Sequence, residues 1–251
     1  MSETAIVIAV GTCAFVLAGF VKGVIGMGLP TIVVGVLSLV TSPAEAVAVM
    51  LMPSLVTNVW QGLAGPHLKP ILRRLWPTFL GVCAGTWLAV ILGVGLLTPE
   101  AAGRARVTLG ATLVVYALLG LAQVRFRLRP NVEPWLGPIV GISTGILSAA
   151  TGVYMIPAVP YYQAIGLERE ALVQAQGVSY TVSTLALAAL LMSGGVLTQG
   201  NTTLSAVAVV PALLGMVLGQ MIRLRVRPKV FRFCFHAGML VLGAHLALVH
   251  R

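Results

Sequence analysis

Two glycine-rich stretches decide how this chain folds: GFVKGVIGMGLP at residues 19–30 and GISTGILSAATGVYMIP at residues 141–157. Each lies inside a long apolar run, one over residues 4–40 and the other over residues 135–165. These runs exceed the roughly 20 residues that one helical span needs. Because glycine and proline interrupt helices, we expect each run to break within its stretch.

Composition places both stretches in a membrane protein. The chain has 251 residues, of which 58% are hydrophobic and 9% charged, and its mean hydropathy is +1.00. A soluble domain of this length cannot hide that much apolar surface from water. We therefore expect residues 1–251 to form a single integral membrane domain. Its eight apolar segments cover residues 4–40, 44–64, 71–97, 107–124, 135–165, 171–192, 203–222 and 231–249.

The two halves of the chain share an ordered series of residues. Gly19 and Gly23 match Gly141 and Gly145 at an offset of 122. Later matches have larger offsets, as loop insertions would produce: Gly28 with Gly152, Glu45 with Glu170, Pro77 with Pro211, Gly81 with Gly215 and Gly85 with Gly219. This order indicates a duplicated unit of four segments. Repeat one covers about 4–124, the linker 125–134 and repeat two about 135–250.

The loop charges indicate that the repeats are inverted. Three basic loops belong in the cytoplasm by the positive-inside rule, whereas the loop over residues 193–202 has no charge and belongs outside. The first half has its basic loop between its second and third segments, and the second half between its third and fourth. The cations of the three loops are Lys69, Arg73, Arg74, Arg125, Arg127, Arg129, Arg223, Arg225, Arg227, Lys229 and Arg232.

Opposite orientation of the halves constrains the two long segments. The fifth must enter and leave the membrane on the same side, so we expect a broken or re-entrant helical hairpin with arms of about 22 Å. By symmetry, the first segment behaves likewise from the other side. The predicted fold is an all-α polytopic membrane protein of two inverted repeats of four hydrophobic segments, each opened by such a hairpin.

The charged and metal-binding residue types exclude several chemistries. There are 16 Lys and Arg against six acids, all six are Glu, and Asp is absent. This argues against Asp pairs, Asp-rich metal motifs and an Asp-bearing ATPase core. The four His and three Cys show no ligand spacing, so we expect no metal, no cofactor and no catalytic residues. The basic surplus is explained by topology, so no nucleic-acid partner is expected.

Breaks at matching positions of two inverted repeats are typical of a substrate site, because non-helical backbone at membrane depth survives only when buried or lining a cavity. Half-helix N-termini there would direct N–H groups toward an anion. In the alternative interpretation, the glycines simply permit close helix packing. The candidate binding residues at the breaks are Gly23, Gly26, Gly28 and Pro30 in the first half and Gly152, Tyr154 and Pro157 in the second.

Lys22 is the one cation deep inside an otherwise apolar run. A lysine at the bilayer centre costs about 2.5 to 3.5 kcal/mol on insertion scales, so it is expected to face a polar cavity, a partner or an anionic substrate. The alternative is that its flexible chain reaches the interface. Lys22 and Thr144 occupy matching positions, so the two half-sites are not chemically equal.

Neutral polar residues follow the second and sixth segments. Such donors can replace the water around an oxyanion without trapping it. Hydrogen bonding between helices is the alternative interpretation. The stripes contain Ser54, Thr57, Asn58 and Gln61, then Gln174, Gln176, Ser179, Tyr180, Thr181, Ser183 and Thr184. Of these, Asn58, Gln61, Gln176 and Tyr180 join Lys22 as candidate substrate-binding residues.

The chain resembles the TauE/SafE family of sulfite and organosulfonate exporters, also called the 4-toluenesulfonate uptake permeases. The resemblance rests on eight segments in two halves, each opened by a glycine-rich stretch that runs into proline, and it covers nearly the whole chain. It implies multi-pass transport of a small sulfur-containing anion across a bacterial inner membrane, without ATP hydrolysis. The second half departs from the pattern, with Ser148, Ala149 and Ala150 where more glycine is expected.

These features together predict a secondary transporter of sulfite, sulfoacetate, thiosulfate or a similar organosulfonate, with alternating access around a central site. Its expected partners are the anion, a coupling ion, for which the proton is one candidate, and membrane lipid. A passive anion channel would use the same residues. An intramembrane enzyme is the alternative from another class and would need a nucleophile or metal constellation.

Overall fold

The structure of the protein is a computed structural model that describes residues 3–94, 101–122, 127–223, 225 and 228–248. Within these ranges the chain is helical, with ten α-helices, one 3-10 turn and no strand. The elements are α1 (Glu3–Ile25), α2 (Leu29–Leu37), α3 (Pro43–Leu63), α4 (Leu68–Ile91), α5 (Ala101–Ala122), η1 (Pro130–Val132), α6 (Glu133–Thr151), α7 (Ala158–Ala164), α8 (Arg169–Ser193), α9 (Gln199–Ile222) and α10 (Pro228–Leu248).

Six of these helices are long and apolar enough to cross a membrane, namely α3, α4, α5, α8, α9 and α10. They are the six segments whose length predicted a single span, and the prediction of a helical membrane protein is confirmed. The helices α3 and α8 lie at the centre, because 61% and 67% of their apolar windows are buried, against 28% for α10. The polar stripes of the sequence therefore lie on the two central helices.

Both long segments are broken, as predicted. In the first, α1 ends at Ile25 and α2 begins at Leu29 after two glycines with positive φ, Gly26 at 81° and Gly28 at 107°. In the second, α6 ends before Gly152, whose φ is 72°, and α7 begins at Ala158. A positive φ is the left-handed conformation that glycine adopts without a steric penalty, so Gly26 and Gly152 end the preceding helices and Gly28 precedes the start of α2.

Each broken segment folds back on itself. A Cβ at Gly11 of α1 would lie 3.8 Å from Leu37 at the end of α2, and the Tyr161 hydroxyl of α7 donates to the Glu133 carbonyl oxygen at the start of α6. The two arms are unequal, in contrast to the pair of similar arms that we expected. Because the glycines and prolines come late in each apolar run, a long first arm is followed by a short second arm.

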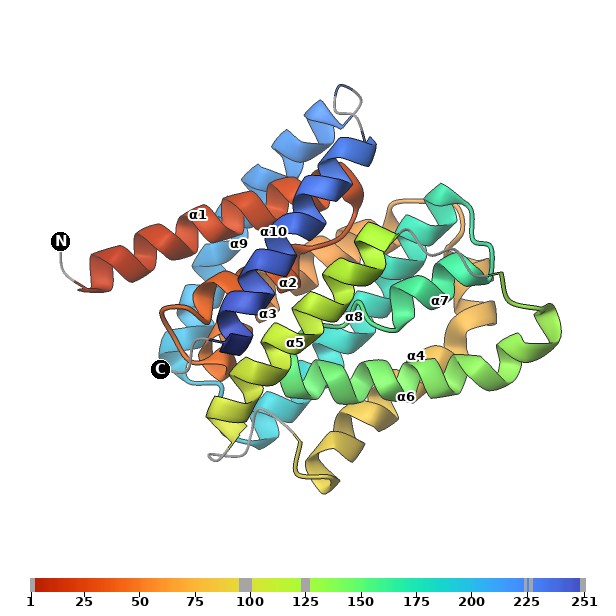
Figure 1. Ribbon diagram of the computed structural model, residues 1–251, viewed down its shortest axis with the longest axis horizontal. Coiled ribbons are helices and arrows are strands. Elements are labelled where there is room, and N and C mark those ends of the chain that lie inside the picture. The colour runs from red at the N-terminus through yellow and green to blue at the C-terminus, as the bar shows by residue number, and fades with distance from the viewer. Residues whose placement is uncertain (1–2, 95–100, 123–126, 224, 226–227, 249–251) are drawn as a thin grey trace.

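Helices pack in pairs that each join the two halves of the chain: α1 with α9, α6 with α4, α3 with α8, and α5 with α10 (Figure 1). All four pairs bring backbone against backbone at glycines, and two of these crossings correspond to each other. A Cβ at Gly19 of α1 would collide with the Ala212 carbonyl of α9, and one at Gly141 of α6 with the Thr78 carbonyl of α4. The two contacts are equivalent, because Gly141 follows Gly19 at the repeat offset of 122 and Ala212 follows Thr78 at the offset of 134. Three further pairs of contacts are equivalent in the same way: Gly23–Met216 with Gly145–Val82, Gly215–Val16 with Gly81–Pro138, and Gly219–Phe20 with Gly85–Ile142.

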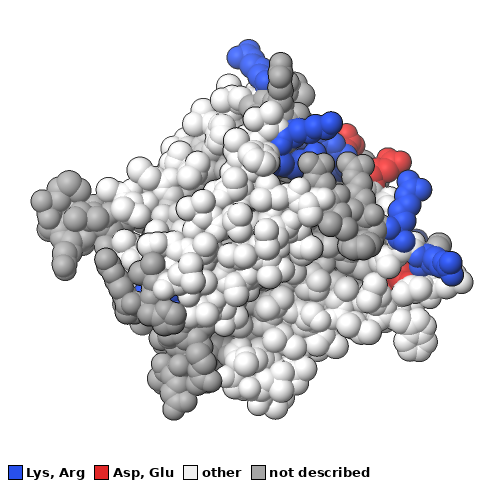
Figure 2. All heavy atoms as spheres, in the orientation of Figure 1, with Lys and Arg blue, Asp and Glu red and all other residues white. Residues whose placement is uncertain are grey.

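The basic loops gather toward one end of the molecule. Figure 2 shows most of the visible Lys and Arg side chains along one edge, together with the visible Glu side chains. In Figure 1 the end of α9, the start of α10 and the start of α6 lie toward that edge, whereas α1 starts and α10 ends on the opposite side. Arg125 and Arg227 lie outside the described residues. The distribution is the one that the positive-inside rule predicts for a single cytoplasmic face.

The glycine crossings should be intolerant of even one methyl group. We expect Gly141→Ala to lower the apparent melting temperature in detergent, because overpacking costs about 1–3 kcal/mol and each kcal/mol shifts Tm by roughly 2–4 °C in a chain of this size. Gly238→Ala is the matched control, since a Cβ at Gly238 meets nothing within 4 Å. Equal melting temperatures for the two variants would contradict this account of the crossing.

Candidate functional site

Lys22 is buried at the centre of the molecule, in the last turn of α1 before the first break, with 2% of its surface exposed. Its ammonium donates to Thr57 Oγ1 at 3.0 Å and to Asn58 Oδ1, both on α3. Both partners are neutral. The prediction that Lys22 faces a polar environment is met, and its side chain does not extend to the surface.

A polar network continues from Asn58 to the second break. Asn58 Nδ2 donates to Ser54 Oγ at 3.0 Å and to Thr184 Oγ1 of α8 at 3.3 Å. The Tyr154 hydroxyl lies 2.6 Å from Ser54 Oγ and 3.0 Å from Thr184 Oγ1. Tyr154 follows α6 at the second break and is fully buried. The network therefore connects the end of α1 with the second break through the two central helices.

Gln61 holds the first break in place. Its side-chain amide donates to the Gly26 carbonyl oxygen at 2.9 Å and to the Val173 carbonyl oxygen of α8 at 2.7 Å. A carbonyl freed by the break is thereby satisfied within the protein, as backbone at membrane depth requires. The break is fixed to both central helices by this one side chain.

Several buried polar atoms near the centre have no hydrogen-bond partner. They include Oε1 of Gln61, both amide atoms of Gln176 and the hydroxyl of Tyr180. Gln176 and Tyr180 are one turn apart on α8, and the Tyr180 ring packs on that of Tyr154 with centroids 5.4 Å apart. Unpartnered buried polar groups are costly and uncommon, so they mark a place where a ligand can complete the hydrogen bonding.

The glycines and prolines of the first break have separate structural roles. Gly23 faces Met216 and Gly219 of α9, so it sets the helix crossing beside Lys22. Gly28 is the N-cap of α2, with no side-chain cap, and Pro30 lies in the first turn. A Cβ at Gly28 would lie 3.1 Å from the Phe235 ring of α10.

The second break contributes two further predicted residues. Gly152 caps the C-terminus of α6, with its N–H donating to the Ser148 carbonyl oxygen, and a Cβ there would collide with the Val47 side chain of α3. Pro157 is the N-cap of α7 and follows a cis peptide bond. Both residues shape the chain on either side of Tyr154.

Three residues join the network although the sequence did not single them out as substrate contacts: Ser54, Thr57 and Thr184. The contact of Ser54 with the network could have been predicted, because Ser54 and Asn58 are spaced by one helical turn. The contacts of Thr184 with the network depend on how α8 packs on α3, which a single sequence does not specify.

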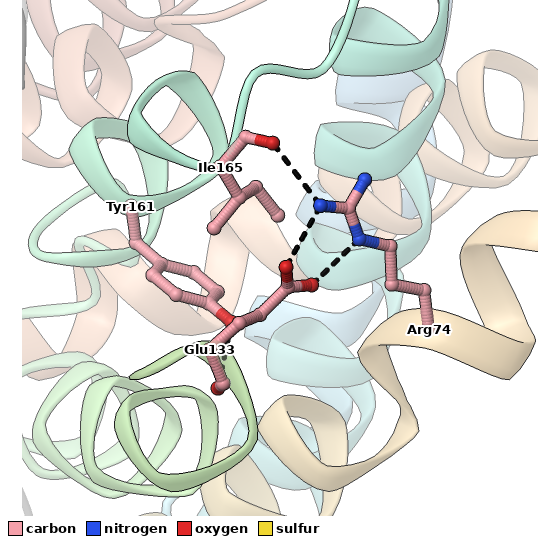
Figure 3. Close-up of polar contacts among 4 residues, drawn as sticks. All are labelled: Arg74, Glu133, Tyr161 and Ile165. Atoms are coloured by element: carbon pink, nitrogen blue, oxygen red, sulfur yellow. Dashed lines mark hydrogen bonds and ion pairs between the residues drawn. The ribbon is translucent and has the colours of Figure 1, made fainter. Parts of the chain in front are cut away.

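A second polar cluster lies at the mouth of the α6–α7 hairpin (Figure 3). Arg74 of α4 donates from Nε and Nη2 to the two Glu133 carboxylate oxygens at 2.6 and 2.8 Å, and from Nη2 to the Ile165 carbonyl oxygen at 3.1 Å. Tyr161 donates to the Glu133 carbonyl oxygen at 3.4 Å. This bidentate pair ties both ends of the hairpin to α4. It also means that the Arg74 charge is already neutralised.

The fold and the network define a polytopic helical membrane protein with a buried polar centre at two helix breaks. Residues 11–246 match the family model described as Sulfite exporter TauE/SafE. The chain belongs to this family, which is a family of membrane transporters. No curated protein and no solved structure matches the chain.

The contact between Lys22 and Asn58 should be energetically coupled. We expect Asn58→Leu to destabilise the protein by about 1.5–3 kcal/mol, because it deprives a buried ammonium of one of its two acceptors. Adding Lys22→Met should recover part of this loss, since the unpaired charge is then gone. Thermal unfolding in detergent of the two single variants and the double variant tests this, and strictly additive effects would contradict it.

Proposed function

We propose that the protein is a secondary transporter that moves a small sulfur-containing oxyanion, such as sulfite, sulfoacetate, thiosulfate or a related organosulfonate, across a bacterial inner membrane. Transport is coupled to an ion gradient. The observation that carries the proposal is the buried Lys22 ammonium, whose hydrogen-bond partners are neutral.

The chemistry around Lys22 suits an oxyanion. An ammonium has three N–H donors, and two of them go to Thr57 and Asn58. The third is available to an anion oxygen, and the charge attracts the anion strongly because water is excluded. The Gln176 amide and the Tyr180 hydroxyl supply unused neutral donors. A site with one charge and several neutral donors binds an anion firmly enough to select it and still releases it.

The mechanism that we propose is alternating access between two inverted repeats. The equal backbone crossings of α1 on α9 and of α6 on α4 support a two-fold relation between the halves. In Figure 1, α1 and α6 run in opposite directions across the molecule. Rocking of one repeat against the other would open the buried centre to each side in turn.

Arg74, at the mouth of the α6–α7 hairpin, is a poorer anion site than Lys22. Arg74 lines a pocket of about 340 Å³ together with Glu133 and Tyr161. Its guanidinium already binds a carboxylate in a bidentate pair, so an incoming anion would have to displace Glu133. Lys22 faces no such competition from its neutral partners.

Removing the Lys22 charge should abolish transport while leaving the fold intact. We expect Lys22→Met to reduce sulfite flux into proteoliposomes by roughly tenfold or more, because a charged hydrogen bond of about 1.5–3 kcal/mol is lost from the bound anion. Lys69→Met is the control, since Lys69 is exposed in the first turn of α4. Normal flux in Lys22→Met protein that elutes as a single folded species would overturn the role given to Lys22.

Counterflow separates a carrier from a channel. Vesicles loaded with unlabelled sulfite should accumulate labelled sulfite transiently above its equilibrium level, because alternating access exchanges one anion for another. A passive channel would only equilibrate the label. Equilibration without overshoot would therefore contradict the carrier mechanism and favour a passive channel. It would not contradict the proposed anion-binding site.

A further inference from the structure

The two repeats treat the ends of their broken helices differently. Lys22 lies in the last turn of α1, where its ammonium offsets the partial negative charge of the helix C-terminus. The equivalent helix of the second repeat, α6, ends at the second break and has no basic residue in its last turn. Thr144 occupies the place of Lys22 and is fully buried, and its hydroxyl donates to the Val140 carbonyl oxygen at 2.7 Å.

Two buried serine hydroxyls without hydrogen-bond partners lie on the helices α6 and α8. Ser148 is in the last turn of α6, and Ser183 is on α8, against which α6 packs. The repeat offset of 125 between α3 and α8 places Ser183 where Asn58 lies in the first repeat. Asn58 accepts a hydrogen bond from the Lys22 ammonium, whereas Ser183 Oγ has no partner. The second repeat therefore has the oxygens but lacks the resident cation.

We propose that a sodium ion binds at the C-terminal end of α6, held by Ser148 Oγ, Ser183 Oγ and the carbonyl oxygens of the last turn, and that it is the coupling ion of transport. The inference rests on the proposed function for its coupling role, but not for the binding site itself. Helix C-termini at membrane depth, together with unwound backbone, are where transporters of this architecture hold their coupling cations.

The residue types select a monovalent metal ion. Hydroxyl and carbonyl oxygens are neutral ligands, whereas sites for Ca²⁺ and Mg²⁺ use carboxylates. A proton bound at this helix end would need a titratable group there, whereas Thr144, Ser148 and Ser183 do not titrate at physiological pH. A sodium ion would give both unpartnered hydroxyl oxygens a partner. It would also place a positive charge at α6 equivalent to the Lys22 ammonium at α1.

The position also explains how the ion would be coupled to the anion. Ser183 is adjacent to Thr184, whose hydroxyl contacts both Asn58 and Tyr154 in the polar network. Ser148 is in the last turn of α6, and the chain leads from there to Tyr154. Binding of the ion would therefore fix both sides of the network that faces the anion, which gives each ligand a higher affinity in the presence of the other.

Sodium binding is tested without transport, by thermal unfolding of the detergent-solubilised full chain at constant ionic strength in NaCl, KCl or choline chloride. We expect saturating Na⁺ to raise the apparent Tm by about 3 °C or more over choline. Ser183→Ala and Ser148→Ala should each abolish this difference. Ser183→Thr keeps a hydroxyl and should retain it, as should Ser143→Ala, whose hydroxyl is already bonded to the Ile139 carbonyl oxygen. A wild-type Tm that is equal in Na⁺ and choline would overturn the site, whether or not the variants fold.

Flux measurements separate the two proposals. An inward Na⁺ gradient should drive sulfite accumulation in wild-type proteoliposomes but not in Ser183→Ala, whereas Ser143→Ala should behave as wild type. Sulfite counterflow that is independent of Na⁺ would overturn the coupling role and leave the proposed anion transport standing. A Na⁺-dependent Tm in a protein that carries no sulfite would overturn the proposed function and leave the sodium site standing.

Discussion

Close backbone contact at the glycine crossings holds the helices of this protein in place. Lipid gives helices no hydrophobic reason to associate, so they are held by packing, and packing is tightest where no side chain intervenes. Gly19 on α1 and Gly141 on α6 occupy equivalent crossings. These crossings hold the two broken helices against α9 and α4, and therefore position the helix ends from which the breaks begin.

The breaks are tolerated because the protein satisfies them internally. Gln61 binds the freed Gly26 carbonyl oxygen and attaches it to α8, while Tyr154 at the other break bonds to Ser54 and Thr184. Irregular backbone in lipid would leave such groups unpaired at a cost of several kcal/mol each. Some polar residues of α3 and α8 thus form interhelical hydrogen bonds, as one interpretation of the sequence predicted. Others, such as Gln176 and Tyr180, have side-chain atoms without a hydrogen-bond partner.

Much of this arrangement was predictable from the sequence, and the remainder depended on packing. The broken segments, the six single spans and the polar setting of Lys22 follow from glycine, proline and charge placed within apolar runs. The unequal arms and the joining of Thr184 to Tyr154 did not follow, since they depend on where α7 and α8 lie against their neighbours. The substrate-binding roles of these residues stay predictions.

In the proposed mechanism, the chemical difference between the two halves suits the movement of an anion. Two fixed ammonium groups facing one centre would hold a small oxyanion too firmly to release it, because attraction in a dry site is strong. With no ammonium group at all, nothing would compensate the cost of removing water from the anion. Lys22 in one repeat with Thr144 in the other gives a single lysine charge. In the proposed mechanism, further positive charge comes from an ion that binds and leaves with each cycle, so the attraction is raised for binding and lowered for release.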